Sequence, residues 1–410
     1  MNATPPWPPV APPDSTSASP LGPVRPRYGG GSLADVLPSV FAALGVPVTP
    51  DPRFGLPAMW DPLGLGAGSL AGVRRVAVLL VDGLGRHQLP QAAPYAPGLV
   101  EFAAGANTRT LTSGFPSTTP VSLVSVGTGV GPGRHGVVGF TVRVPATGRV
   151  LNHIRWGNDP DPAQWQPVPT LFERAAGAGV PVTVVSRAEY AGSGLTVAAY
   201  RGAGYRAATG VDALVDGVTA ALRDPGGLVF GYHPDLDHAG HRHGLTSPEW
   251  AAAAGDVDRL VTRLADELPA DAALLVTADH GMLDAQPEGR IDIDDDPRLS
   301  AGVEVVAGEL RVRYLHTVPG ARDDVLATWR AVLGDDAWVA SREEAVAAGW
   351  YGPVPAAHRY RIGDVVVACL RRQVVVASRS EPAFVAGMVG VHGSCTAAEM
   401  EIPLIIVRGG

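Results

Sequence analysis

The stretch 76–81 constrains the fold of this chain more than any other, because every one of its residues is Val, Ala or Leu. A strand with one face in solvent alternates apolar and polar residues, whereas a strand covered on both faces is apolar throughout. Asp82 ends the run, and Gly83 and Gly85 follow it. Open α/β sheets bind ligands at the carboxyl ends of their strands, so Asp82 is a candidate functional carboxylate.

Helical patterns followed by short apolar strands recur along the chain. The pairs are 169–176 with 180–186, 211–223 with 228–232, and 247–268 with 272–277, and a last strand is expected at 402–407. Ser247 followed by Pro248 is typical of a helix start. Alternating units of this kind predict an α/β fold with a mostly parallel central sheet and helices on both faces.

The residues between 283 and 378 have a different pattern. They contain an acidic loop at 291–296, a strand at 310–316, a helix at 321–333, a short strand at 338–340, and a hairpin formed by 365–370 and 373–377. We interpret 283–378 as a smaller α+β subdomain or an elaboration. Residues 32–282 and 379–410 then form the catalytic α/β domain, and the Pro- and Gly-rich residues 1–31 are expected to be a disordered leader.

Composition excludes several classes of protein. The net charge of −8 over 410 residues argues against a general nucleic-acid-binding surface, which requires a basic face. No apolar run is long enough for a membrane span, and the N-terminus lacks the basic start and apolar middle of a secretory signal. The two cysteines, Cys369 and Cys395, are too few for a disulfide framework. We therefore expect a cytoplasmic protein; its oligomeric state does not follow from the sequence.

A hydroxyl-rich stretch, Ser117-Thr118-Thr119-Pro120, precedes an apolar segment that predicts a helix beginning at Thr119 or Pro120. A hydroxyl at a helix start lies among unpaired main-chain N–H groups and at the positive end of the helix dipole. That environment favours an oxyanion or a bound phosphate. A plain Ser/Thr helix cap is the alternative, and this stretch alone does not separate the two.

Aspartates and histidines follow two further strands. The segment 232–244 contains Asp235, Asp237 and His241, and Asp279-His280 follow the strand at 272–277. Carboxylates gathered at one sheet edge repel one another unless a divalent cation lies among them. Mixed Asp and His ligands suit Zn²⁺, and carboxylate-rich sets suit Mn²⁺. If this segment forms a helical turn, Asp237 and His241 lie on one side of it and both reach one ion. Asp235 is the alternative to Asp237 as the ligand.

The other histidines have simpler interpretations. Those outside any cluster are expected to be surface or hydrogen-bonding residues: His87, His153, His316 and His358. His135, in a Gly-rich turn, is expected to order that loop. Histidines near the second acidic segment are expected either to support the metal ligands or to be exposed: His233, His238 and His243.

Five motifs together resemble the alkaline phosphatase superfamily. In chain order they are Val81-Asp82-Gly83, Pro116-Ser117-Thr118-Thr119, Asp237-x-x-Gly240-His241, Ala278-Asp279-His280-Gly281 and His392-Gly393. Within the superfamily the chain is most similar to the nucleotide pyrophosphatase/phosphodiesterase branch, from about Val76 to His392.

The resemblance implies a site with two metal ions, normally zinc. Asp82, Thr119, Asp279 and His280 match the ligands of one ion, and Asp237, His241 and His392 match those of the other. Thr119 matches the nucleophile, with the neighbouring Thr118 as the alternative. The implied activity is a phosphodiesterase or nucleotide pyrophosphatase that acts on a small phosphoester or nucleotide through a phosphothreonine intermediate.

The chain also departs from that branch. Phe140 stands where the branch usually has an asparagine that contacts a phosphoryl oxygen, and Pro120 stands where an aromatic residue usually follows the nucleophile. Tyr232 matches an aromatic residue of the base pocket, so Tyr232 and Phe140 are the candidate substrate-binding residues. A sulfatase motif carries an arginine after its proline. No arginine follows Pro120 at that place, so sulfatase activity is not expected. The alternatives are a phosphomonoesterase, a phosphonate hydrolase, a phosphotransferase and a non-catalytic metal-binding module.

Overall fold

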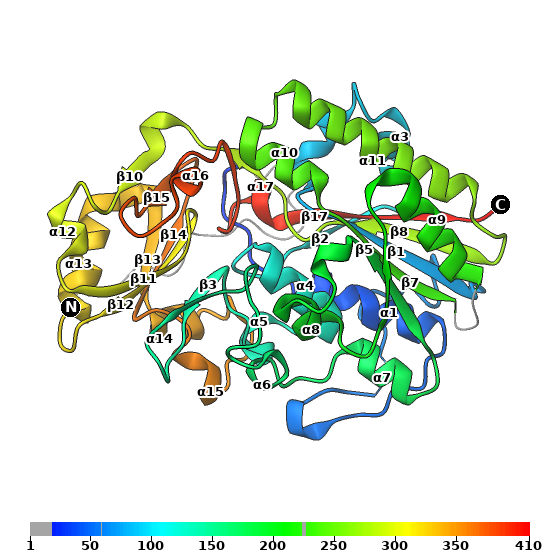
Figure 1. Cartoon of the computed structure of the whole chain (residues 1–410), viewed down its shortest axis with the longest axis horizontal. Coiled ribbons are helices and arrows are strands. Elements are labelled where there is room, and N and C mark those ends of the chain that lie inside the picture. The colour runs from blue at the N-terminus through cyan, green and yellow to red at the C-terminus, as the bar shows by residue number, and fades with distance from the viewer. Residues whose placement is uncertain (1–18, 59, 224–226) are drawn as a thin grey trace.

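The computed structural model describes residues 19–58, 60–223 and 227–410 (Figure 1). Within them, a seven-stranded sheet forms the centre of the molecule. Its order is β2 (Arg109–Thr112), β17 (Glu401–Arg408), β8 (Ala272–Thr277), β1 (Arg75–Val81), β7 (Leu228–His233), β5 (Val182–Ser186) and β6 (Gly204–Ala207). The pairs from β8 to β6 are parallel, and β17 is antiparallel to both of its neighbours. The predicted fold class is confirmed.

β1 lies inside this sheet because it is apolar on both faces, and the residues from Val76 to Val81 are all buried. Its neighbours run in the same direction, with Leu80 opposite Tyr232 of β7 and Thr277 of β8. The three strands therefore end at one edge of the sheet. This alignment carries the residues after each strand to a common place.

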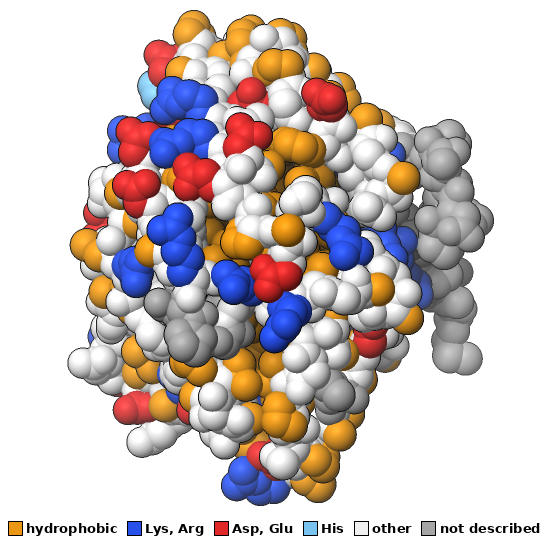
Figure 2. All heavy atoms as spheres, turned by 90° about the vertical axis from the view of Figure 1, so that its right-hand side faces the viewer, with side chains coloured by type: hydrophobic (Ala, Val, Ile, Leu, Met, Phe, Trp, Pro, Cys, Tyr) orange, Lys and Arg blue, Asp and Glu red, His pale blue; other side chains and the backbone are white. Residues whose placement is uncertain are grey.

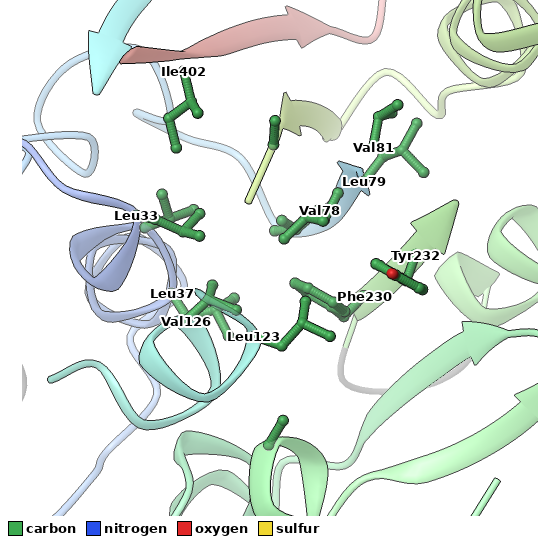
Figure 3. Close-up of a cluster of buried hydrophobic side chains, with 14 of the residues drawn as sticks. Leu33, Leu37, Val78, Leu79, Val81, Leu123, Val126, Phe230, Tyr232 and Ile402 are labelled. Carbon is green, nitrogen blue, oxygen red and sulfur yellow. The ribbon is translucent and has the colours of Figure 1, made fainter. Parts of the chain in front are cut away.

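Helices cover both faces of the sheet (Figure 1). On one face lie α1 (Val36–Ala43), α4 (Thr119–Thr128), α7 (Leu171–Gly177) and α8 (Gly194–Tyr200); on the other lie α3 (Pro97–Ala103), α9 (Gly210–Arg223) and α11 (Pro248–Asp266). Ser247 caps α11 as expected, because its side chain accepts a hydrogen bond from the main-chain N–H of Trp250. Figure 3 shows Val78 of β1 and Phe230 of β7 on the side of Leu123 in α4, while Val81 lies on the opposite side of β1.

A smaller antiparallel sheet lies beside the main one (Figure 1). Its order is β11 (Val303–Glu309), β12 (Val312–Thr317), β14 (Val365–Cys369) and β13 (Ala337–Ser341), with α13 (Arg322–Leu333) packed against it. The division into a catalytic domain and a subdomain at 283–378 stays a prediction.

The hairpin expected from 365–370 and 373–377 is wrong. β14 is buried at every position and pairs with β12 and β13, so both of its edges are occupied. After a turn in which Arg371 has a positive φ, β15 (Val374–Val376) pairs instead, in parallel, with β10 (Arg290–Asp292). The start of the expected acidic loop is thus a strand.

The expected disordered leader is also wrong for residues 19–31, while residues 1–18 lie outside the described residues. Val24 N–H donates to the carbonyl of Cys395 at 2.7 Å, and Ala398 N–H donates to Pro20 at 2.8 Å. A Pro- and Gly-rich composition does not prevent such main-chain pairing when a second segment supplies the partners.

Short elements complete the described chain. The strands are β3 (Thr141–Arg143), β4 (Val150–Asn152), β9 (Leu283–Asp284) and β16 (Gly390–Val391), and the helices are α2 (Leu89–Ala92), α5 (Pro132–His135), α6 (Pro162–Trp165), α10 (Asp235–His243), α12 (Pro297–Ser300), α14 (Arg342–Ala347), α15 (Ala356–Arg359), α16 (Ala383–Ala386) and α17 (Ala397–Met400). In the part of the chain described, no helix has the length and apolar character that crossing a membrane requires. Figure 2 shows arginine and acidic side chains interspersed on one face. The cytoplasmic location stays a prediction.

Candidate metal centre

Three ligand-type side chains meet at the carboxyl ends of β1 and β8. Asp82 follows β1, Asp279 and His280 follow β8, and one ligand atom of each lies within 4.8 Å of the others. The Nε2 atom of His280 is 3.4 Å from Asp82 Oδ1 and 3.2 Å from Asp279 Oδ2. We call this group the inner cluster, because all three side chains are buried.

A second group, the outer cluster, consists of Asp237, His241 and His392. Asp237 and His241 lie one turn apart on α10, and the distance from His241 Nε2 to Asp237 Oδ2 is 3.3 Å. His392 follows β16, and its Nε2 atom is 3.6 Å from Asp237 Oδ1. α10 begins directly after β7, which explains why this cluster lies at the same sheet edge as the inner one.

The two clusters are adjacent. The rings of His280 and His392 stack with centroids 3.5 Å apart and an interplanar angle of 15°. Thr119, the first residue of α4, places its Oγ1 atom 3.2 Å from His280 Nε2. The seven residues predicted to bind metal are therefore brought to one place.

Each cluster histidine directs its Nε2 atom into its cluster. The Nδ1 atoms lie 2.8 to 3.0 Å from main-chain carbonyls: Gly281 for His280, Gly390 for His241, and Ser117 for His392. A carbonyl only accepts, so we assign the proton of each neutral ring to Nδ1. This is the arrangement that metal-binding histidines usually have. The Nε2 atoms of His241 and His392 are only 3.2 Å apart, and two lone pairs at that distance repel unless a cation lies beside them.

The cluster carboxylates also lack partners. Asp82 Oδ1, Asp237 Oδ1 and Asp279 Oδ2 are buried without a hydrogen bond from any described residue. Burial raises the pKa of Asp237 to about 7, although nearby His241 opposes the shift. Burial and the neighbouring Asp279 carboxylate raise the pKa of Asp82 well above its usual range. Buried polar groups almost always have a partner, so these orphan oxygens and ring nitrogens fit divalent cations.

The structure also separates residues that the sequence left as alternatives. Asp235 points away from the outer cluster to form an ion pair with Arg187, whereas Asp237 contacts His241. The Thr118 hydroxyl is buried and has no hydrogen-bond partner among the described residues, whereas the Thr119 hydroxyl contacts His280.

Of the two predicted substrate-binding residues, Tyr232 lies at the inner cluster. Its hydroxyl donates to Asp82 Oδ2, and its ring meets that of Tyr190 edge-on, with centroids 6.0 Å apart. The main-chain carbonyl of Phe140 accepts a hydrogen bond from His153 N–H at 3.1 Å. The role of Phe140 in substrate binding stays a prediction.

Several histidines outside the clusters have protein hydrogen-bond partners, whereas the Nε2 atoms of His233 and His316 are buried without one among the described residues. His135 is buried, with Nε2 3.0 Å from Ser125 Oγ, and its Nδ1 atom accepts from Val137 N–H, so it orders its loop as expected. His153 lies between the Gly139 carbonyl and the indole N–H of Trp165.

Sequence reasoning missed two acidic residues near His392. Glu309, at the end of β11, lies against Gly393, and its Oε2 atom is 4.0 Å from His392 Nδ1. Glu399 accepts hydrogen bonds from Ser394 N–H and the Thr396 hydroxyl. The spacing Thr396-x-x-Glu399 is a capping-box pattern that could have indicated Glu399, whereas Glu309 has no comparable signal.

Several solved structures share the fold of this chain. Phosphonoacetate hydrolase from Sinorhizobium meliloti, in complex with phosphonoformate, has a TM-score of 0.63 at 21% identity, covering 82% of this chain and 90% of that chain. Murine ectonucleotide pyrophosphatase/phosphodiesterase 5 has a TM-score of 0.63 at 17% identity, covering 80% and 87%. The human protein of that name has a TM-score of 0.61 at 19% identity, covering 82% and 88%. At these identities the matches show a shared fold.

A family model described as type I phosphodiesterase / nucleotide pyrophosphatase matches residues 76–395. The chain belongs to this family, whose members are phosphoester hydrolases. Comparison with curated protein sequences found no significant match.

Proposed function

We propose that this protein is a two-metal phosphodiesterase or nucleotide pyrophosphatase that uses Thr119 as its nucleophile. The observation that carries the proposal is the placement of the Thr119 hydroxyl beside His280, next to two adjacent Asp/His clusters whose buried carboxylate oxygens include three without a hydrogen bond from the described residues. The substrate is a small phosphoester or nucleotide.

The inner cluster and Thr119 would hold one divalent ion, and the outer cluster the other. Bound ions would favour ionisation of the attacking hydroxyl and neutralise charge on the phosphoryl and leaving-group oxygens. The mixture of carboxylate and imidazole ligands favours Zn²⁺, with Mn²⁺ as the alternative.

The chain's own groups orient and stabilise the reaction. Thr119 Oγ1 loses its proton to solvent and attacks phosphorus. A bond to Oγ1 forms, the bond to the leaving alkoxide breaks, and that alkoxide takes up a proton from solvent. Main-chain N–H groups at the start of α4 lack helical acceptors and face the developing negative charge. Water then cleaves the phosphothreonine and regenerates the hydroxyl.

A comparison of two neighbouring substitutions tests the nucleophile. Thr119→Ala should lower hydrolysis of bis(4-nitrophenyl) phosphate by about 10³-fold or more, because Thr119 supplies the only hydroxyl hydrogen-bonded to His280 among the described residues. Thr118→Ala, the matched control, should change it by less than about 10-fold. Support comes from the murine relative, whose structure with AMP is of an inactive threonine-to-alanine variant. Wild-type rates in Thr119→Ala, or loss of activity in Thr118→Ala alone, would contradict the assignment.

Metal content and substrate class are measured on the wild-type protein. We expect two ions per chain and faster hydrolysis of the diester than of 4-nitrophenyl phosphate. Faster monoester hydrolysis would instead identify a phosphomonoesterase.

Release of acetate from phosphonoacetate would identify a phosphonate hydrolase, an alternative supported by the activity of the Sinorhizobium meliloti relative. Transfer products with added alcohols would identify a phosphotransferase, and metal binding without turnover a binding module.

A further inference from the structure

A buried ion pair joins the two sheets of the molecule. Arg311 lies in the turn between β11 and β12 of the smaller sheet, and Glu399 lies in α17, directly before β17 of the main sheet. Both side chains are fully buried. Two hydrogen bonds connect them, from Nε to Oε1 at 2.9 Å and from Nη2 to Oε2 at 2.7 Å. A buried ion pair contributes little net stability. The segments that Arg311 and Glu399 hold in place therefore say more about their role than the stability of the pair does.

The Glu399 carboxylate also holds the segment that carries His392. Ser394 N–H donates to Oε1 at 2.9 Å, and the Thr396 hydroxyl donates to Oε2 at 2.6 Å. Ser394 is two residues beyond His392, and its carbonyl accepts from the Ser117 hydroxyl at 2.6 Å. Glu399 therefore fixes the turn from which His392 reaches the outer cluster.

The main chain of Glu399 contacts the inner cluster as well. Its carbonyl accepts from Gly281 N–H at 2.8 Å, and Gly281 directly follows His280. The approach is close, because a Cβ atom added at Gly281 would lie 2.1 Å from the Ala398 carbonyl oxygen. One residue thus holds the chain next to both stacked histidines, His280 and His392.

Arg311 is fixed in turn by the smaller sheet. Its Nη1 atom donates to the Gln373 carbonyl, and its own carbonyl accepts from Cys369 N–H at 2.8 Å. Two residues earlier, at the end of β11, Glu309 lies against Gly393. The smaller sheet therefore contacts the His392 segment directly through Glu309, and Arg311 reaches it through Glu399.

We propose that Arg311 and Glu399 are positioning residues that hold the His280 and His392 rings in their stacked arrangement, with centroids 3.5 Å apart and one ring in each cluster. The inference rests on the proposed metal-dependent function and extends it: the smaller sheet is part of the metal centre, although it supplies none of the seven ligands. Neither residue touches substrate. The outer ion depends on the pair more strongly, because Glu399 holds the His392 segment with its side chain and the His280 segment only with its main chain.

Metal affinity, measured by titration with Zn²⁺ against a chromophoric chelator, tests the proposal without reference to turnover. Glu399→Gln should weaken binding of one of the two ions by roughly 10- to 100-fold, the range seen when groups that support metal ligands are changed. Arg311→Lys should give a smaller loss, because lysine keeps the charge but not the paired hydrogen bonds.

Arg313 and Glu381 provide a matched control. Arg313 of β12 forms a second ion pair with Glu381, which follows β15, and Nη2 lies 2.7 Å from Oε2. Arg313 also donates to the Val375 carbonyl, and it makes no hydrogen bond to the His392 segment among the described residues. Glu381→Gln should leave both Zn²⁺ affinities within about twofold of wild type. If Glu399→Gln fails to fold, the double variant Arg311→Met/Glu399→Met removes both charges and should fold with the same loss of one ion.

The outcomes separate the two proposals. If the wild-type protein binds neither Zn²⁺ nor Mn²⁺, the proposed function is wrong and the positioning role is wrong with it. If the wild type binds two ions and the folded Glu399 and double variants bind them equally tightly, only the positioning role is overturned. An equal loss in Glu381→Gln would also overturn it, because a general weakening of the smaller sheet would then explain the effect.

Discussion

The inner and outer clusters offer the same kinds of ligand atom from different structural settings. In the inner cluster, Asp279 and His280 are fully buried, and Asp279 Oδ1 accepts from Gly83 N–H at 3.1 Å. In the outer cluster the side chains of Asp237 and His241 keep 14% and 21% of their exposure. Ends of adjacent strands hold one cluster, and a short helix and a loop hold the other. Under the proposed function, the inner cluster would fix the nucleophile, and the outer cluster would meet the leaving group and water.

The largest effect is expected from His280→Ala in the inner cluster. The change removes a proposed ligand and the contact to Thr119 Oγ1. We expect kcat/KM to fall by at least about 10³-fold, beyond the 10- to 100-fold typical of groups that only support ligands. Added Zn²⁺ or imidazole should not restore activity, because the site is buried. Restoration would show that the inner cluster is as accessible as the outer one and would break the comparison.

His241→Ala, in the outer cluster, should have a smaller and partly reversible effect. We expect a loss of about 10²-fold at limiting metal, because Asp237 and His392 remain as ligands. Raising the Zn²⁺ concentration should recover part of the activity, since Asp237 and His241 are partly exposed. The measurement is the rate of diester hydrolysis against free Zn²⁺. A loss as large and as irreversible as that of His280→Ala would show that exposure does not distinguish the clusters.

Tyr232→Phe should have a still smaller effect, confined to the inner cluster. It removes the hydroxyl that donates to Asp82 Oδ2 but keeps the ring. We expect inner-site metal affinity to fall by about 10-fold, with the outer site unchanged. Tyr190→Phe is the control, because it keeps the edge-on ring contact with Tyr232. An altered KM for nucleotides, without a change in metal affinity, would instead favour the predicted substrate-binding role of Tyr232.

Much of the main sheet could be predicted because its signals are local. The apolar run before Asp82 indicates a strand buried on both faces, and the spacing of Asp237 and His241 requires only one helical turn. The choice between Asp235 and Asp237 was not local, since it depends on Arg187, which lies 48 residues before Asp235.

The smaller sheet shows where local signals fail. The segments around 365–370 and 373–377 are both apolar, and adjacent apolar segments usually form a hairpin. Here β12 and β13 occupy both edges of β14, and β10 pairs with β15. Pairing of strands is decided by competing partners distant in sequence, and the pair Arg311–Glu399, 88 residues apart, is equally non-local.

The smallest effect is expected for His153, which lies outside both clusters and should affect stability against pH but not metal binding. His153 has both ring nitrogens occupied by protein groups, the Gly139 carbonyl and the Trp165 N–H, and burial lowers its pKa from 6.5 to about 4. The unfolded chain therefore binds a proton at pH 5 that the folded protein does not, so stability falls as the pH drops from 6.5 towards 4. The lowered pKa contributes about 3 kcal/mol to the free energy of unfolding at neutral pH, and about 2 kcal/mol of this contribution is lost by pH 5.

Urea unfolding at pH 7 and pH 5 should show this loss in the wild type and a smaller loss in His153→Gln. Added Zn²⁺ should leave the difference in unfolding free energy between the two proteins unchanged, because both ring nitrogens of His153 are hydrogen-bonded to protein groups. A difference that depends on Zn²⁺ would place His153 among the metal ligands.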